Sequence, residues 1–141
     1  MQSIQTLTLA EAQKIADGAE AKAIELGIKI AIAILDAHGN LKLYRRMDES
    51  SFISVRMSQL KAMTSSSIPL STKALAEKNA SLENSPYANV PGIVLLEGGL
   101  PIITKEGQHI GAIGVSGATS LQDGQCAEAG LQCIKAKLKI D

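Results

Sequence analysis

Large and small apolar side chains alternate along residues 28–35, and this alternation is the clearest structural signal in the chain. The larger set comprises Ile28, Ile30, Ile32 and Ile34, and the other positions hold Lys29, Ala31, Ala33 and Leu35. A period of two residues is typical of a β-strand whose two faces differ. Turn-forming residues follow at 36–40, and residues 41–47 alternate again. The two runs predict an antiparallel hairpin with one bulky and one small face, both covered.

A helical period precedes this hairpin. Thr8 and Glu11 have the spacing of a capping box, so a helix is predicted to begin near Leu9. Gly27 suits the left-handed residue that ends many helices. Between these points alanines recur at helical spacing, at Ala12, Ala16, Ala19 and Ala23. We expect this alanine stripe to allow close approach to the sheet.

Three further helices are predicted. Residues 48–51 can cap a helix that runs to about Ser66, with Ile53, Met57 and Leu60 on one side. A short helix is predicted at residues 71–82, followed by an irregular loop at 84–92. Ser120 and Asp123 have the spacing of another capping box, which predicts a final helix over residues 120–138.

Three apolar runs in the second half of the chain predict strands, at residues 93–96, 100–104 and 109–116. The predicted order is helix, two strands, two helices, three strands and helix. Strands joined by tight turns favour an antiparallel sheet with helices packed on it. We therefore expect one α+β domain over residues 1–141, with a five-stranded antiparallel sheet flanked by helices.

Composition narrows the classes of partner. The 14 basic and 14 acidic side chains cancel, so nothing favours nucleic acid or anionic lipid. No apolar run approaches the ~18 residues of a membrane span, and the first residues lack a secretory pattern, so a cytosolic protein is expected. Cys126 and Cys133 lie about 10 Å apart along a helix, beyond disulfide reach. With only three aromatic residues, a flat ligand would need walls of aliphatic side chains.

A set of short strings is distributed along nearly the whole chain. They are Ile34-Leu-Asp-Ala-His-Gly-Asn-Leu41, Arg46-Met-Asp48, Lys61-Ala62, Pro91-Gly92, Gly98-Gly-Leu-Pro-Ile102, Gly111-Ala-Ile-Gly-Val-Ser-Gly117, Asp123 and Ala127-Glu-Ala-Gly130. Together they resemble the GlcG/HbpS-like family, whose domain also forms the C-terminal part of PduO-type proteins. The resemblance implies a profilin-like fold, and self-association into dimers or higher oligomers.

The same resemblance implies a small-molecule ligand. Relatives bind or degrade haem, and others accompany corrinoid, glycolate or diol metabolism, which makes haem the candidate cofactor. Haem-binding relatives draw an iron ligand from a histidine in or near the first helix, but residues 8–26 contain none. His38 and His109 are the only imidazoles and thus the candidate metal ligands. For each of them the alternative is an ordinary residue in a surface turn.

Two basic residues are candidates for holding a ligand carboxylate. Arg46 offers a bidentate guanidinium, and Lys61 on the following helix is a candidate for the same anion site. The alternatives are a surface pair between Arg46 and Asp48, with Asp48 capping the next helix, and a solvated Lys61. Met47 is a candidate soft ligand for haem iron, although methionine more often fills a core.

A glycine-spaced strand runs into the last helix. Gly114, Ser116 and Gly117 are candidate ligand contacts, because unpaired N–H groups at a helix start attract anions. The alternative is that the glycines serve packing and the turn itself. His109 lies roughly 20 Å along the strand from Ser116, which argues against a nucleophilic serine. We expect a recess where this strand meets the last helix beside the first hairpin.

Three functions are compatible with these features. The first is a cytosolic, oligomeric protein that binds haem or a related tetrapyrrole. The second is an enzyme or accessory factor for a small hydroxy acid or diol-pathway metabolite, held at Arg46 and the glycine-rich turn. The third is a structural subunit whose apolar surface serves self-assembly. No acid–base pair is evident, which favours binding over catalysis, so the first is our working hypothesis and the second its alternative.

Overall fold

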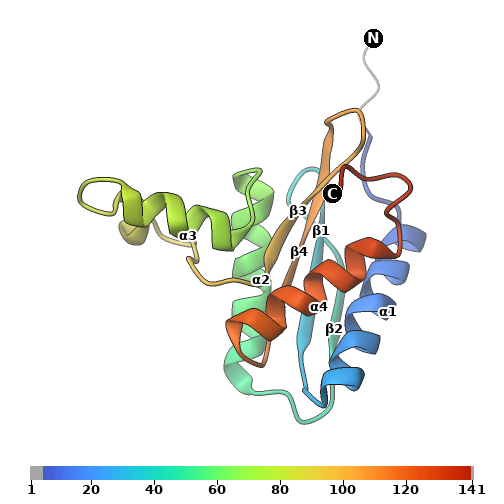
Figure 1. Cartoon of the computed structure of the whole chain (residues 1–141). Coiled ribbons are helices and arrows are strands. Elements are labelled where there is room, and N and C mark those ends of the chain that lie inside the picture. The colour runs from blue at the N-terminus through green and yellow to red at the C-terminus, as the bar shows by residue number, and fades with distance from the viewer. Residues whose placement is uncertain (1–4, 141) are drawn as a thin grey trace.

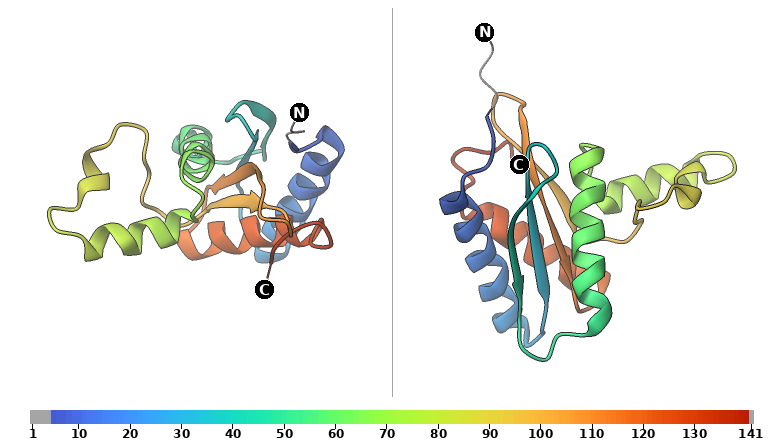
Figure 2. Two further views of the ribbon diagram at one scale, coloured as in Figure 1. Left: turned by 90° about the horizontal axis from the view of Figure 1, so that it is seen from above. Right: turned by 180° about the vertical axis from the view of Figure 1, so that it is seen from behind.

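The computed structural model describes residues 5–140 (Figure 1). Its elements, in order, are α1 (Leu9–Leu26), β1 (Ala31–Asp36), β2 (Leu41–Arg46), α2 (Phe52–Ser67), α3 (Thr72–Ser81), the 3-10 helix η1 (Pro86–Asn89), β3 (Gly99–Ile103), β4 (His109–Ser116) and α4 (Ser120–Gln132). The strands form one antiparallel sheet in the order β2-β1-β4-β3. Helices α1 and α4 cover one face, α2 covers the other, and α3 projects away from the body (Figures 1 and 2). The predicted α+β class is confirmed.

The sheet has four strands, so the prediction of five is wrong. Residues 93–96 are irregular because their backbone contacts α2 instead of a strand: Val94 N donates to Thr64 Oγ1 at 3.0 Å, and Thr64 Oγ1 lies 3.3 Å from the Gly92 carbonyl oxygen. The last helix ends at Gln132, earlier than predicted, and Leu138 in the following tail forms an isolated bridge with Thr104. Within residues 5–140, no helix has the length and apolar character that a bilayer crossing requires.

Helix α1 forms as the sequence predicts. Thr8 Oγ1 accepts a hydrogen bond from Glu11 N at 3.1 Å, and a Glu11 carboxylate oxygen accepts one from Thr8 N at 2.9 Å. Gly27 ends the helix at φ 71°. The four alanines of the predicted stripe, Ala12, Ala16, Ala19 and Ala23, are fully buried. At Gly18 an added Cβ would lie 2.4 Å from Cys133 Sγ. Small residues thus bring α1 close to both the sheet and α4.

The two faces of the sheet differ as predicted. Ile32 pairs with Val115 and Ile34 with Ile113, and all four side chains lie in the main core with α1 and α4. On the other face, Ala33 pairs with Gly114, and Leu35 pairs with Ala112. The small face receives α2, whose Ala62 packs against Ala33 and Leu35.

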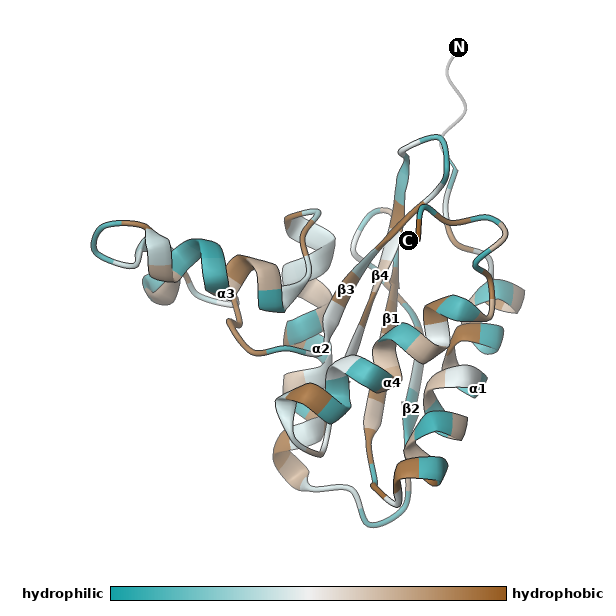
Figure 3. Cartoon of the chain, in the orientation of Figure 1, coloured by the Kyte–Doolittle hydropathy of each residue, from teal (hydrophilic) through white to brown (hydrophobic). Residues whose placement is uncertain are grey.

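Helix α2 does not face the sheet with its apolar side. Its apolar side is not buried: Ile53 is 62% exposed, and Met57 and Leu60 are half-buried. The side that faces the sheet instead consists of small or polar residues, namely Ser54, Ser58, Lys61, Ala62 and Ser65. Larger side chains do not fit there, because an added Cβ on Gly114 would lie 2.0 Å from the Ser58 carbonyl oxygen. Figure 3 shows how little brown α2 carries over most of its length.

The outer edge of β3 is blocked against further strands. Gly99 N donates to Thr72 Oγ1 at 2.9 Å, and Pro101 has no N–H to offer. Farther along, Lys139 N donates to the Ile103 carbonyl at 2.9 Å, so the tail covers the end of the edge. Exposed edge strands invite aggregation, and this edge is protected by proline, a helix residue and the tail together.

The packing of α2 on the sheet predicts a large effect of one methyl group. Gly114→Ala places a Cβ 2.5 Å from Ala62 N as well as against Ser58, so we expect the free energy of unfolding to fall by about 2–3 kcal/mol. Gly107→Ala is the control, because that turn glycine has φ +87° and open space around it. Its cost comes from backbone strain alone, about 1 kcal/mol. Denaturant unfolding that shows equal losses would contradict the packing argument.

Candidate functional site

The sheet brings several of the predicted site residues to one of its ends. Ala31 pairs with Arg46 on one side and with Ser116 on the other, so these three residues lie in one row on the α2-facing side. Met47 and Gly117 directly follow the ends of β2 and β4. The predicted grouping of Arg46, Met47, Ser116 and Gly117 therefore exists at the level of the backbone.

A recess opens at this end, where it was expected. One hollow of about 520 Å³ is lined by Ile28, Lys29, Glu49, Ser51, Gly117, Ala118, Thr119 and Gln122. An adjoining hollow of about 370 Å³ shares Lys29 and is otherwise lined by Glu20, Ile24, Arg46, Met47 and Asp48. We refer to the two together as the recess. Each volume falls in the range of small-molecule sites, although both hollows are open to solvent.

Arg46 is available to a ligand on the wall of the recess. Its Nε donates to Ser50 Oγ at 3.3 Å, and among the described residues no carboxylate lies within ion-pair distance of its guanidinium. The alternative pairing of Arg46 with Asp48 is therefore not formed. Ser51, and not Asp48, occupies the N-cap position of α2. The neighbouring Arg45, by contrast, is held by Asp17 at 2.8 Å on the opposite face.

The glycine-rich turn serves packing first. Gly114 lies under α2, and an added Cβ on Gly117, at φ 142°, would lie 2.3 Å from the Lys29 carbonyl. Ser116 is 8% exposed. The start of α4 is capped by its own chain, since Thr119 Oγ1 accepts from Gln122 N at 3.2 Å and Gln122 caps back. The capping box is thus one residue earlier than the predicted one at Ser120 and Asp123.

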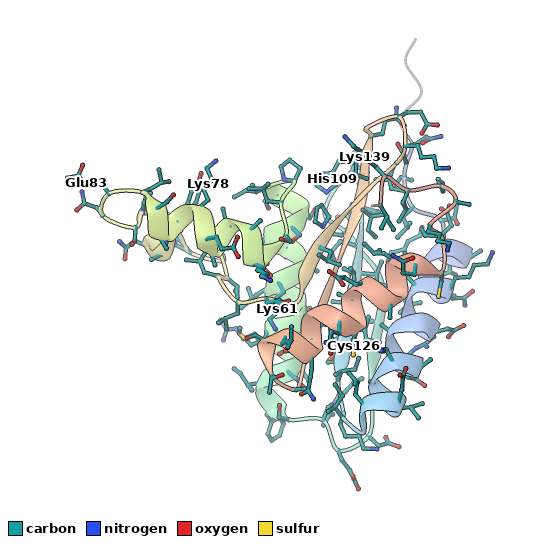
Figure 4. All side chains as sticks on the ribbon, viewed as in Figure 1. Lys61, Lys78, Glu83, His109, Cys126 and Lys139 are labelled. Atoms are coloured by element: carbon teal, nitrogen blue, oxygen red, sulfur yellow. The ribbon has the colours of Figure 1, made fainter. Side chains whose placement is uncertain are left out.

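Asp123 is consequently free for a different role, a buried ion pair with Lys61 (Figure 4 labels Lys61). Lys61 Nζ lies 3.1 Å from Asp123 Oδ2 and 2.9 Å from the Val115 carbonyl, and both side chains are 3% exposed. Asp123 Oδ1 also accepts from Ala118 N at 3.0 Å. Burial raises the pKa of Asp123, although Lys61 and the backbone N–H groups act in the opposite direction. Lys61 therefore ties α2 to α4 and does not line the recess.

The two histidines lie at the other end of the sheet. Asp36 pairs with Gly111, so the turn that contains His38 and the start of β4 at His109 are near each other and far from the recess. His38 is exposed. His109 Nε2 is buried and has no hydrogen-bond partner among residues 5–140, and burial lowers the pKa of this imidazole. Among residues 5–140, no cluster of three or more metal-binding side chains is formed. Iron ligation by either histidine stays a prediction.

Sequence reasoning missed two features of this region. Lys29 joins both hollows of the recess, but it reads in the sequence as an ordinary polar position of a strand. The Lys61–Asp123 pair joins residues 62 positions apart. One signal in the sequence could have indicated that Lys61 is buried. Lys61 is next to Ala62, and Ala62 is a small residue of the kind that the small face of the sheet can accept.

Comparisons with known proteins agree with this architecture. A family model described as haem degrading protein HbpS-like matches residues 7–132. An uncharacterised 15.0 kDa protein from the dhaT–dhaS intergenic region of Citrobacter freundii is 39% identical over 136 residues, covering 94% of this chain and 95% of that protein. A crystal structure of a Streptomyces reticuli HbpS double mutant is 32% identical with a TM-score of 0.84, covering 94% of this chain and 89% of that one.

A third relative is larger. The corrinoid adenosyltransferase PduO of Citrobacter freundii is 27% identical over 135 residues, which cover 94% of this chain but 40% of PduO. This chain is therefore similar to one part of that enzyme. The resemblance drawn from the sequence motifs, including the link to PduO-type proteins, is confirmed.

The buried ion pair predicts a strongly asymmetric mutational response. Lys61→Met leaves the Asp123 carboxylate buried without its cation, so we expect the free energy of unfolding at pH 7 to fall by about 3–5 kcal/mol. Lys61→Met combined with Asp123→Leu removes both charges and is expected to be more stable than the single variant. Lys22→Met, in the exposed pair with Glu25, is the control and should cost less than about 1 kcal/mol. Additive losses in the double variant would show that the two charges are not coupled.

Proposed function

The chain belongs to the HbpS-like family, and we propose that it binds haem or a related tetrapyrrole in the recess at the end of the sheet. The observation that carries the proposal is the chemical composition of that recess. Arg46 and Lys29 present two cations, while Met47, Ile24 and Ile28 present apolar surface beside them. A tetrapyrrole with carboxylate side chains needs this combination of apolar walls and a few cationic groups.

The residues present fit the organic part of such a ligand better than its metal. Within the described residues that line the recess there is no imidazole, and Met47 supplies the one thioether. Methionine is an established axial ligand of haem iron. Binding through Arg46, Lys29 and apolar contacts is therefore the core of the proposal, with Met47 as the residue that would hold the iron. The proposal is one of binding and includes no reaction step.

A small hydroxy acid or diol-pathway metabolite is the alternative ligand. Arg46, whose guanidinium has no ion-pair partner among the described residues, lines one hollow of the recess, and the turn at Gly117 lines the other. The carboxylate of such a metabolite would bind to Arg46. Because Thr119 and Gln122 already cap the start of α4, the turn has fewer free N–H groups than a bare helix start offers. This favours the larger, apolar ligand.

Haem titration separates these ligands and sites. We expect a saturable change of the Soret band with wild-type protein, and about tenfold weaker binding for Arg46→Ala, which loses a charge-assisted contact. Met47→Leu should shift the Soret maximum if the thioether ligates iron. His38→Ala and His109→Ala are the controls and should bind as wild type, because they lie at the other end of the sheet.

Two results would contradict the proposal. A spectrum identical to that of free haem would show that the protein does not bind haem. If His109→Ala loses binding and Arg46→Ala binds as wild type, the recess is not the binding site. If haem does not bind, but glycolate raises the melting temperature of the wild type and does not raise that of Arg46→Ala, the alternative ligand is supported.

Self-association is the second part of the proposal. Within residues 5–140, ten large apolar side chains are markedly exposed, and six of them belong to α2 or to residues 72–98: Phe52, Ile53, Met63, Leu82, Val90 and Leu96. Phe52 is 92% exposed. Exposed apolar side chains that gather on a surface are a mark of protein–protein contact. With no net charge to select a charged partner, the outer side of α2 and the projecting α3 segment suit a second copy of the chain.

Sedimentation equilibrium tests this surface. Phe52→Arg together with Ile53→Arg should shift the protein from oligomer to monomer, because two charges would have to be desolvated at the interface. Leu41→Arg is the control, since Leu41 is also exposed, at 54%, but lies on β2. Unchanged mass in the α2 variant, or equal loss in the control, would show that α2 is not the interface.

A further inference from the structure

The C-terminal tail borders a second concave surface. Hollows of about 340 and 430 Å³ flank residues 138–140 and share Gln132 and Ile140. We call the two together the tail groove. It lies beside the C-terminal part of α4, whereas the recess lies at the beginning of this helix, so the two sites have no lining residue in common. Figure 4 labels Lys139 on this tail.

Backbone contacts hold the tail in place. Leu138 forms a bridge with Thr104 and is 3% exposed. Lys139 N donates to the Ile103 carbonyl at 2.9 Å, and Lys105 N donates to the Lys137 carbonyl at 3.1 Å. The tail is thus bound by its backbone to the end of β3 and the following turn, which fixes the wall of the groove that it forms. A pre-formed site is the usual condition for small-molecule binding.

The floor of the groove is apolar and continuous with the protein core. Leu131 is 7% exposed and belongs to the main core, and Leu100 and Ile140 pack against that core while remaining half-buried. Covering these side chains would remove further apolar surface from water. The floor therefore favours an alkyl chain or a comparable apolar group.

The rim carries positive charge. Lys105, Lys135 and Lys139 are exposed and line the groove, and within residues 5–140 none of them has a carboxylate at ion-pair distance. Among residues 5–140, Glu128 is the one carboxylate that lines the groove. Lys137, which lies between these lysines, is turned away and pairs with Glu11 at 2.6 Å. Three cations against one anion select a negatively charged ligand.

We propose that the tail groove binds an amphipathic carboxylate, with its apolar part on Leu100, Leu131 and Ile140 and its carboxylate among the rim lysines. An inorganic anion would gain only the lysine contacts, which are weak because they are exposed. A neutral alkyl compound would gain only the floor. The two features together favour a molecule that carries both groups, and this inference is independent of the function proposed for the recess.

Nuclear magnetic resonance titration of the whole chain with octanoate tests this site. We expect saturable shifts of amide signals at residues 100–105 and 128–140, with acetate and octanol binding at least about fivefold more weakly. Lys139→Glu should weaken octanoate binding about fivefold, and Ile140→Ser about tenfold. Lys73→Glu, an exposed lysine on α3, is the matched control and should have no effect. Arg46→Ala should also bind octanoate normally, which separates this site from the recess.

Three outcomes would overturn the proposal. Octanoate shifts confined to the recess or to α2 would place the ligand elsewhere. Wild-type affinity in both Lys139→Glu and Ile140→Ser would show that neither the rim nor the floor contributes. Shifts of residues 128–140 that appear on raising the protein concentration alone would assign the groove to a second copy of the chain.

Discussion

Direct contact between helix α2 and the backbone of the sheet determines most of this structure. Gly114 has no room for a side chain because the Ser58 carbonyl and Ala62 N lie against it, and Ala33 and Ala112 continue the same thin surface. Only serine, alanine and one lysine stem fit between helix and sheet. The serine hydroxyls there have hydrogen-bond acceptors: Ser58 Oγ donates to the Val55 carbonyl of its own helix, and Ser65 Oγ donates to the Leu70 carbonyl beyond the end of the helix. A helix of this composition stays on the sheet through close fit and not through large apolar side chains.

Two consequences extend from this contact. The large apolar residues Phe52, Ile53 and Met63 of α2 remain exposed on its outer side, and they belong to the surface proposed above for self-association. Lys61 is buried at this contact, and its ammonium group donates hydrogen bonds to Asp123 and to the Val115 carbonyl. Because Asp123 also accepts from Ala118 N, the same pair positions the turn between β4 and α4, and this turn forms one wall of the recess.

The chain belongs to the HbpS-like family, and the composition of the recess supports the proposal that it binds a tetrapyrrole. The end of the sheet gathers Arg46, Met47 and Lys29 around an opening, while the histidines are held at the opposite end. A tetrapyrrole site in this chain would therefore depend on cations, apolar contacts and a thioether more than on imidazole. The tail groove offers a separate surface of similar character, apolar below and basic at the rim.

The amino-acid sequence by itself determined the elements whose signals are local. The capping box at Thr8, the alanine stripe of α1, the alternating run at residues 28–35 and the α+β class all follow from contacts between near neighbours. Tertiary structure alone decided that residues 93–96 lie on α2, that α2 faces the sheet with its serines, and that Lys61 meets Asp123. These three features depend on which surface each segment contacts, and the contacting residues are far apart in the chain. The periodicity of a segment indicates that it has two different sides, but it does not indicate which side another element can approach.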